Sequence, residues 1–152
     1  EALVAERLRA LIPDRLPLLV RISATDWVEG GWDIGQSVVL AGRLKALGVD
    51  LIDVSSGALV ADARIPVAPG FQVPFARRIR AEAGIMTGAV GMITEPAQAN
   101  AIVADGDADL VFLARQLLRE PYWVMRAREE LGEPADWPIP YGYAIRRRAP
   151  AD

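Results

Sequence analysis

The sequence predicts an α/β fold with a parallel sheet, organised as the second half of an eight-stranded β/α barrel. A unit made of a helix, a glycine, a short apolar strand and a corner of small residues occurs three times, with its glycines at Gly48, Gly84 and Gly106. Such alternation of helices and strands is typical of right-handed βαβ units and a parallel sheet. The four strands counted here are half of the eight that close a barrel, so we expect the chain to supply about the last four strand–helix units.

The apolar character of the strands favours this half-barrel over a complete small domain. Hydrophobic residues make up 52% of the 152 residues, and the mean hydropathy is +0.19, which indicates strands buried on both faces. Such a sheet alone would leave two unpaired edges, which natural folds avoid. The alternative is a compact doubly wound domain, whose phosphate loop follows the first strand. The corner after the first strand, SATDWVEGGWD, has no G-x-G-x-x-G.

The elements can be assigned in chain order. Residues 2–12 predict a helix, because Val4, Leu8, Leu11 and Ile12 share one face. Strands are expected at residues 16–22, 51–54, 85–90 and 110–113. Helices are expected at residues 37–47, from Pro74 to the stop at Gly84, from Pro96 to the stop at Gly106, after Ala114-Arg115, and at residues 121–131. We therefore expect residues 1–131 to form the half-barrel and residues 132–152 to form an irregular, proline-rich tail.

The composition limits the kinds of binding site and the cellular location that we expect for the protein. The sequence has no cysteine and no histidine, which excludes disulfides, thiolate metal sites and the usual transition-metal ligands. A net charge of −3 gives no reason to expect nucleic acid, and the arginines at 146–148 are expected to be a solvated tail. No apolar run could span a membrane and no signal peptide opens the sequence, so we expect a cytoplasmic protein. Because the first helix begins without a cap, we expect that preceding residues were removed by processing or truncation.

Two consecutive strand–helix corners have the features of an anion site. The motif GAVG, from Gly88 to Gly91, follows the third strand, and Ala114-Arg115 follows the fourth. Small residues leave backbone N–H groups accessible, and helix N-termini attract anions. In β/α barrels a phosphate often binds at the loops after the last two strands. We therefore expect a cofactor phosphate here, although the glycines could simply turn the chain and Arg115 could be a surface residue.

Arg21 places a permanent charge inside the apolar run LPLLVRI. Strand alternation puts it on the face opposite Val20 and Ile22, so we expect it to point into the barrel near the carboxyl ends of the strands. It could form a structural ion pair with Asp53 on the next strand, or it could face an anionic ligand or a cofactor ring that gains negative charge. Ser55 and Ser56 end the second strand, where serines more commonly bind local turn amides than ligands.

Four sequence blocks carry a resemblance to a known family: LPLLVRISATDWVEGGWD, GVDLIDVSSGALV, PGFQVPFARRIRAEAGIMTGAVGMIT and ADLVFLARQLLREPYW. In this order and spacing, over about residues 16–125, they resemble the C-terminal half of the Old Yellow Enzyme family, in its thermophilic-like branch of FMN-dependent ene-reductases. The resemblance implies an eight-stranded β/α barrel that binds FMN at its mouth. It implies that Arg21 lies against the N1/C2-carbonyl edge of the flavin. It further implies that Ser55, Ser56 and Gly57 lie near the cofactor, and that Gly88, Val90, Gly91, Ala114 and Arg115 surround the phosphate.

The activity implied by the resemblance belongs to a complete barrel. NAD(P)H would reduce FMN, and hydride would then reach the β-carbon of an α,β-unsaturated carbonyl compound. The family's His/His or His/Asn pair and its tyrosine proton donor lie in the first half, and this chain has no histidine. We therefore expect an oligomer, with either a first-half polypeptide or a second half-barrel as partner. The alternatives are a self-assembling half-barrel that binds without catalysis and, more weakly, another phosphate-binding barrel.

Overall fold

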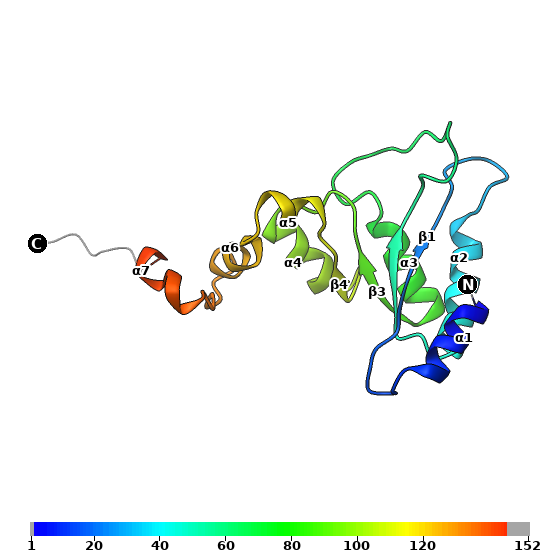
Figure 1. The fold of residues 1–152 in the computed structure, drawn as a ribbon. Helices are drawn as coiled ribbons and strands as arrows, with labels where there is room; N and C mark the ends of the chain where they lie inside the picture. Colours follow the sequence, from blue (N-terminus) through cyan, green and yellow to red (C-terminus); the bar gives the residue numbers. More distant parts are fainter. Residues whose placement is uncertain (1, 146–152) are drawn as a thin grey trace, which may run out of the picture.

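The computed structural model describes residues 2–145 and contains one sheet of four parallel strands in the order β1-β2-β3-β4. The strands are β1 (Leu19–Ser23), β2 (Leu51–Ser55), β3 (Met86–Ala89) and β4 (Leu110–Val111) (Figure 1). The helices are α1 (Ala2–Leu11), α2 (Ile34–Ala46), α3 (Val73–Ala83), α4 (Pro96–Ala104), α5 (Arg115–Arg119) and α6 (Trp123–Glu130). The predicted parallel sheet, with its strands in sequential order, is confirmed.

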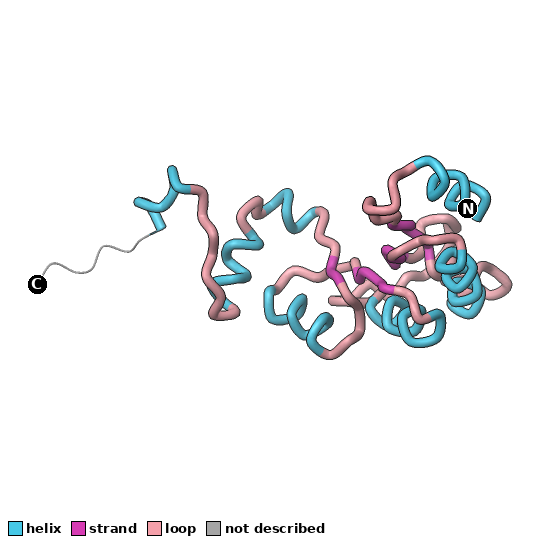
Figure 2. The backbone as a smooth tube through the Cα atoms, turned by 90° about the horizontal axis from the view of Figure 1, so that it is seen from below, coloured by secondary structure: helices cyan, strands magenta, loops and turns pink. Residues whose placement is uncertain are grey.

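The two faces of the sheet differ in their surroundings, although Leu51 on the face away from the helices is also buried. Helices α2, α3 and α4 lie along the same side of the strands (Figure 2). The side chains that face these helices are buried: Ile22, Ile52, Val54, Thr87 and Ala89. On the opposite face, called the inner face below, Leu19, Met86 and Leu110 are 43%, 52% and 47% exposed. This one-sided cover is what half of a barrel requires, because the inner face is filled only when the sheet closes.

The strand register forms layers across the inner face. Arg21 pairs with Asp53, Asp53 with Gly88, and Gly88 with Leu110. Arg21 therefore lies on the face away from the helices, as strand alternation predicts. The layer runs from the charged pair of β1 and β2 through Gly88 to Leu110 on β4, and it crosses the first three strands near their middle.

A repeated aspartate ties the amino ends of neighbouring strands together. The Asp50 carboxylate, just before β2, accepts a hydrogen bond from the Leu18 N–H at 2.7 Å. The Asp109 carboxylate, just before β4, accepts one from the Thr87 N–H at 2.9 Å. Each carboxylate also pairs with an arginine of a preceding helix, Arg9 at 3.5 Å and Arg80 at 3.1 Å. The Leu18 N–H is therefore bound by a side chain rather than by a neighbouring strand. Strand β1 begins after it, at Leu19 rather than at the predicted residue 16.

Several element boundaries differ from the prediction for identifiable reasons. Helix α2 begins at Ile34, three residues early, because Asp33 and Gln36 form a capping box. Strand β4 ends at Val111, although the Phe112 N–H still donates to the Ala89 carbonyl at 2.8 Å, because the chain then turns toward α5. The predicted apolar face of α1 is exposed at Val4, Leu8 and Leu11, and only Ala5 is buried in this helix. Ile12, the fourth residue of the predicted face, packs against the core, and the other three remain exposed among the described residues.

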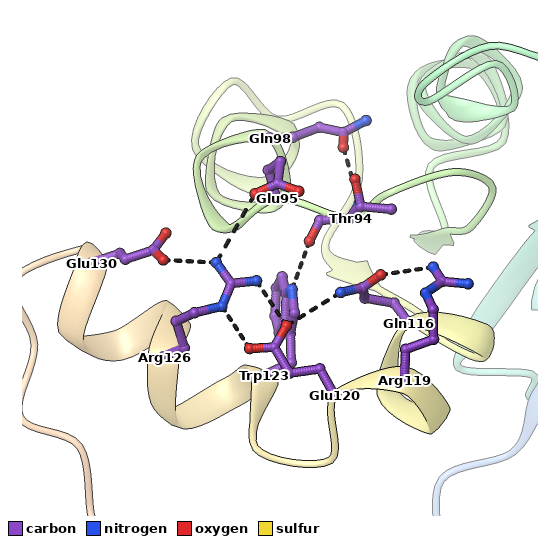
Figure 3. A network of polar contacts seen from close by, with 9 residues as sticks. All are labelled: Thr94, Glu95, Gln98, Gln116, Arg119, Glu120, Trp123, Arg126 and Glu130. Carbon is purple, nitrogen blue, oxygen red and sulfur yellow. Dashed lines mark hydrogen bonds and ion pairs between the residues drawn. The ribbon is translucent and has the colours of Figure 1, made fainter. Parts of the chain in front are cut away.

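Helix α6 buries Trp123 and Ala127 in the core and is also held by polar contacts. Arg126 binds both carboxylate oxygens of Glu120, at 2.6 and 2.9 Å, and this hydrogen bonding holds the pKa of Glu120 below its ordinary value. Arg126 also contacts Glu130 at 2.7 Å (Figure 3). The buried Trp123 donates from its indole N–H to the Thr94 carbonyl at 2.6 Å. Helix α6 is thereby fixed to the corner that precedes α4.

The C-terminal tail contains more structure than the prediction of an irregular segment allowed. It has a 3-10 turn, η1 (Ile139–Tyr141), and a single helical turn, α7 (Gly142–Ile145). Tyr122 packs on Trp137 and Tyr141, with ring centroids 5.4 and 5.8 Å apart. The arginines at 146–148 lie outside the described residues. None of the helices in residues 2–145 is long and apolar enough to cross a membrane.

The open edges of β1 and β4 and the exposed inner face lead to a prediction about association. We expect the isolated 152-residue chain to associate in a concentration-dependent way, measured by size exclusion with light scattering. Met86→Lys on the inner face should weaken the association. The control is Val103→Lys, the same kind of apolar-to-lysine change on α4, where the valine is 43% exposed. This variant should not weaken the association. A chain that is monomeric at every concentration would contradict the expectation.

Candidate active site at the mouth of the half-barrel

The corner between β3 and α4 has an unusual backbone. Gly91 has φ +116° and the following Met92 has φ +48°, so two successive residues lie in the left-handed region. A Cβ at Gly91 would approach the Gln72 amide nitrogen to 2.5 Å. Only glycine fits there, because the backbone conformation and the available space both exclude a side chain. Consecutive residues of unusual φ can direct successive N–H groups toward one point, as in anion-binding nests.

The carbonyl groups of residues 90–92 are each bound by a donor from another part of the chain. Val90 O accepts from the Gln72 side chain at 2.8 Å, and Gly91 O accepts from the Gly70 N–H at 3.1 Å. Met92 O accepts from the Gln98 side chain at 3.2 Å. In contrast, the N–H groups of Gly91, Met92 and Ile93 donate to no acceptor in residues 2–145. The N–H groups of residues 91–93 are therefore free, while the carbonyls of residues 90–92 are occupied.

Residues 91–93 line a cavity of about 320 Å³ that lies between the last two strand–helix corners. Its lining includes the predicted residues Val90, Gly91, Ala114 and Arg115, together with Phe112. Arg115 is exposed and has no carboxylate partner within the described part of the chain. The residues that carry these three free amides therefore line the same cavity as Arg115, and donors of this kind suit a phosphate.

Gly88 lies beside this cavity rather than in its lining. A Cβ at Gly88 would overlap the Phe112 ring, so the aromatic side chain lies directly over the glycine backbone. The glycine lets the β4–α5 corner approach β3 closely. Gly88 therefore shapes the pocket through Phe112.

Arg21 and Asp53 form the charged pair of the inner face. The Arg21 Nη1 and Asp53 Oδ2 atoms are 3.4 Å apart, and the side chains are 58% and 13% exposed. Burial raises the pKa of Asp53 and the Arg21 charge lowers it, with a net increase. Asp53 Oδ1 is buried without a hydrogen-bond partner in the described residues. The predicted ion pair is therefore present, and the guanidinium still has donors free to face a ligand.

The end of β2 carries three predicted site residues, Ser55, Ser56 and Gly57. Strand β2 lies between β1, which carries Arg21, and β3, which leads into the cavity corner. The Ser56 hydroxyl donates to the Gln72 Oε1 atom at 2.7 Å, and the Ser55 hydroxyl approaches the same oxygen at 3.5 Å. The serines thus bind a side chain rather than local turn amides. Gly57 has φ +72° and accepts a hydrogen bond from Ser23 at 3.2 Å, which links the ends of β1 and β2.

Gln72 is a residue of the site that the sequence prediction missed. It contacts both the β2 end and the β3–α4 corner, and it is only 4% exposed. The signal in the sequence was weak, since a glutamine just before Val73-Pro74 looks like an ordinary first residue of a helix. The motif PGFQVP was part of the family resemblance, but the glutamine carried no separate pattern.

The fold and the site define a class: a segment of a β/α barrel with an anion pocket at its last two corners and a charged pair on its inner face. A model of the NADH:flavin oxidoreductase / NADH oxidase family matches residues 3–133. The chain belongs to this family. The family's description and the names of the relatives agree with the predicted cofactor and reductant, FMN with NAD(P)H.

Individual relatives agree with this assignment. The chain is 55% identical over 125 residues to an NADPH dehydrogenase of Geobacillus thermodenitrificans (strain NG80-2). This alignment covers 82% of this chain and 36% of the relative. It is 60% identical over 116 residues to an NADPH dehydrogenase of Geobacillus sp. (strain WCH70). This alignment covers 76% of this chain and 34% of the relative. The chain therefore spans about a third of the length of the curated relatives it matches.

Two solved structures share the fold. A 2-naphthoyl-CoA reductase in complex with 2-naphthoyl-CoA superposes with a TM-score of 0.74 at 22% identity, over 88% of this chain and 21% of that one. A histamine dehydrogenase from Rhizobium sp. 4-9 superposes with a TM-score of 0.67 at 22% identity, over 85% of this chain and 19% of that one. These matches confirm that the chain is part of a β/α barrel.

The Arg21–Asp53 pair gives a prediction for titration. Arg21→Met removes the charge that lowers the pKa of Asp53 while burial remains, so this pKa should rise further. A carboxyl pKa above its unfolded value means that stability is highest below the unfolded pKa and falls as pH rises toward the folded one. The variant should widen that window, as measured by ¹³C carboxyl shifts and by unfolding at several pH values.

The matched control for this titration is Arg77→Met. Arg77 pairs with Asp107 at the same 3.4 Å distance, and its side chain is 61% exposed on α3. This variant should leave the Asp53 titration unchanged. An Asp53 pKa that does not move in Arg21→Met would show that the pair does not interact electrostatically.

Proposed function

We propose that this chain supplies the FMN-phosphate end and the inner-face cation of an ene-reductase barrel that uses NAD(P)H to reduce activated C=C bonds of α,β-unsaturated carbonyl compounds. The observation that carries the proposal is the cavity of about 320 Å³ that Arg115 lines together with Gly91, Met92 and Ile93, whose N–H groups have no acceptor in residues 2–145. The family match and the NADPH dehydrogenase names of the relatives support the cofactor and the reductant.

The pocket fits a phosphate by the chemistry of its donors. A phosphate monoester offers only acceptor oxygens near neutral pH, and it is bound by N–H groups and guanidinium. The corner presents three such amides, and its carbonyls at residues 90–92 are occupied by other donors. No carboxylate pairs with Arg115 in residues 2–145, so its charge is available to an anion.

Arg21 has the position of a cation on the inner face. Its backbone is fixed by pairing with β2, and its side chain is held from one side by Asp53. When bound, FMN would supply hydride chemistry, and its ring gains negative charge on reduction. A guanidinium held near that ring favours the reduced form, while Asp53 partly offsets this effect.

The remainder of the active site belongs to residues outside this chain. The substrate-binding pair and the proton donor implied by the family resemblance would come from the first half of the barrel. That half, on the same or another polypeptide, would cover the inner face and the open edges of β1 and β4. A cytoplasmic location is part of this proposal.

A binding module that closes by self-assembly is the second candidate, favoured by the exposed inner face at Leu19, Met86 and Leu110. It would require neither the amide cluster nor the unpaired Arg115. A bound-flavin absorption band in the assembled protein distinguishes the two, because the self-assembled module without catalysis predicts none.

Arg115 should contribute to cofactor affinity through the phosphate. We expect Arg115→Ala in the complete barrel to weaken FMN binding by about 1.5–3 kcal/mol, the value of a hydrogen bond to a charged group. Riboflavin lacks the phosphate and should bind equally to both proteins. Arg78→Ala on α3 is the control, since Arg78 does not line the cavity and pairs with Glu82 at 2.7 Å. Flavin fluorescence titration measures both affinities, and an equal loss for FMN and riboflavin would argue against a phosphate contact.

Arg21 should affect the potential of the flavin more than its affinity. Arg21→Met removes a charge that favours the reduced ring, so the midpoint potential should fall by about 20–60 mV, corresponding to about 1–3 kcal/mol for two electrons. FMN affinity should drop less than in Arg115→Ala. A redox titration of the complete barrel measures this. An unchanged potential in a normally folded variant would leave Arg21 with only its structural role beside Asp53.

A further inference from the structure

Gln72 is placed where a helix-capping residue belongs, yet its side chain does not cap the helix. It is the N-cap residue of α3, and its side chain makes no capping hydrogen bond. The carboxamide is instead turned inward and is almost fully buried. Ordering and burying a polar side chain costs free energy, which its hydrogen bonds must offset.

A chain of three side-chain hydrogen bonds runs through this carboxamide. The Trp27 indole N–H donates to the Ser56 Oγ atom at 3.0 Å. The Ser56 hydroxyl donates to Gln72 Oε1 at 2.7 Å, and Gln72 Nε2 donates to the Val90 carbonyl at 2.8 Å. The chain thus connects the ends of β1, β2 and β3.

The chemistry of the donors gives this chain one direction. An indole N–H can only donate, so Ser56 must accept from Trp27 and can give its single proton to Gln72. The Gln72 oxygen therefore faces Ser56, and its NH₂ group must face Val90. Trp27 is itself held by edge-to-face packing on Phe75, with centroids 5.2 Å apart, and it has the left-handed φ of +62°. Such a conformation persists only where the surroundings impose it.

The far end of the chain acts on the anion pocket. Gln72 Nε2 binds Val90 O and lies against the Cα position of Gly91, while Gly70 N–H binds Gly91 O. Two adjacent carbonyls are therefore drawn toward the segment before α3. Because each peptide unit is planar, holding these carbonyls on one side directs the following N–H groups to the other side, toward the cavity.

We propose that Gln72 is a positioning residue for the phosphate-binding corner, and that Trp27 and Ser56 act through it by fixing the orientation of its carboxamide. Gln72 orients the Gly91 and Met92 amides without contacting the cofactor phosphate. This role rests on the proposed function, since it concerns the same pocket. It makes the affinity for the phosphate group depend on a residue that lies behind the corner.

The test compares FMN with riboflavin in the complete barrel. Gln72→Met keeps the shape of the side chain and removes both hydrogen bonds, and it should weaken FMN binding about tenfold, the effect of one lost buried hydrogen bond. Riboflavin affinity should change less than about twofold, because the missing phosphate makes it insensitive to the corner. Gln72→Glu keeps the acceptor for Ser56 but loses the donor to Val90, so it should lose FMN affinity like Gln72→Met.

Two further variants separate positioning from stability. Ser56→Ala leaves Gln72 free to rotate its carboxamide and should cause a smaller, FMN-selective loss of about threefold. Gln36→Met removes a hydrogen bond of the same side-chain type, the 3.0 Å bond from the Asp33 N–H, at the start of α2. It should lower the unfolding temperature and leave the FMN/riboflavin affinity ratio unchanged.

The outcomes are distinct. An FMN-selective loss in the Gln72 and Ser56 variants supports the positioning role. Unchanged FMN affinity, or equal losses for FMN and riboflavin, overturns it, and Ser56→Ala and Gln72→Glu decide the question if Gln72→Met does not fold. A wild-type complete barrel that binds neither flavin overturns the proposed function itself, and this inference with it.

Discussion

The arrangement at the mouth depends on the occupation of the carbonyl groups at residues 90–92. A tight corner has both donors and acceptors, and an anion is repelled by the acceptors as much as it is attracted by the donors. Here Gly70, Gln72 and Gln98 donate hydrogen bonds to these three carbonyls. Thr94, at the end of the same corner, is bound at its carbonyl by Trp123 and at its N–H by Gln98. The excess of free donors at this corner therefore depends on hydrogen bonds that other segments make to its carbonyls.

This dependence explains why the corner requires elements that are distant in sequence. Helix α6 contributes Trp123, and the segment before α3 contributes Gln72 and Gly70. The Glu120–Arg126 pair in turn fixes the start of α6 (Figure 3). A change in the packing of α6 would thus reach the pocket through the Thr94 carbonyl, although α6 itself does not line the cavity.

The sequence predicted the parts of the molecule that follow from periodicity and small residues. The four strands, their order, the inward position of Arg21 and the joining of Gly91 with Arg115 at one pocket all follow from local patterns and from the parallel topology. The hydrogen-bond partners of Ser56 could not be predicted, because they depend on the side-chain direction of Gln72, for which nothing in the sequence gives a signal. The start of α2 at Ile34 was missed, although Asp33 and Gln36 have the spacing of a capping box. The exposure of α1 could not be read from its pattern, because an apolar face does not reveal which chain covers it.

The aspartates before β2 and β4 and the residues of the pocket lie at opposite ends of the sheet. Asp50 and Asp109 join neighbouring strands at their amino ends with the same kind of carboxylate-to-amide bond. The pocket residues lie at the opposite ends of the strands. A protein engineer could therefore exchange the mouth corners for those of another barrel, or reinforce the opposite end against heat, as two separate operations on one scaffold. The same separation gives natural variation freedom to change the ligand while the strands keep their register.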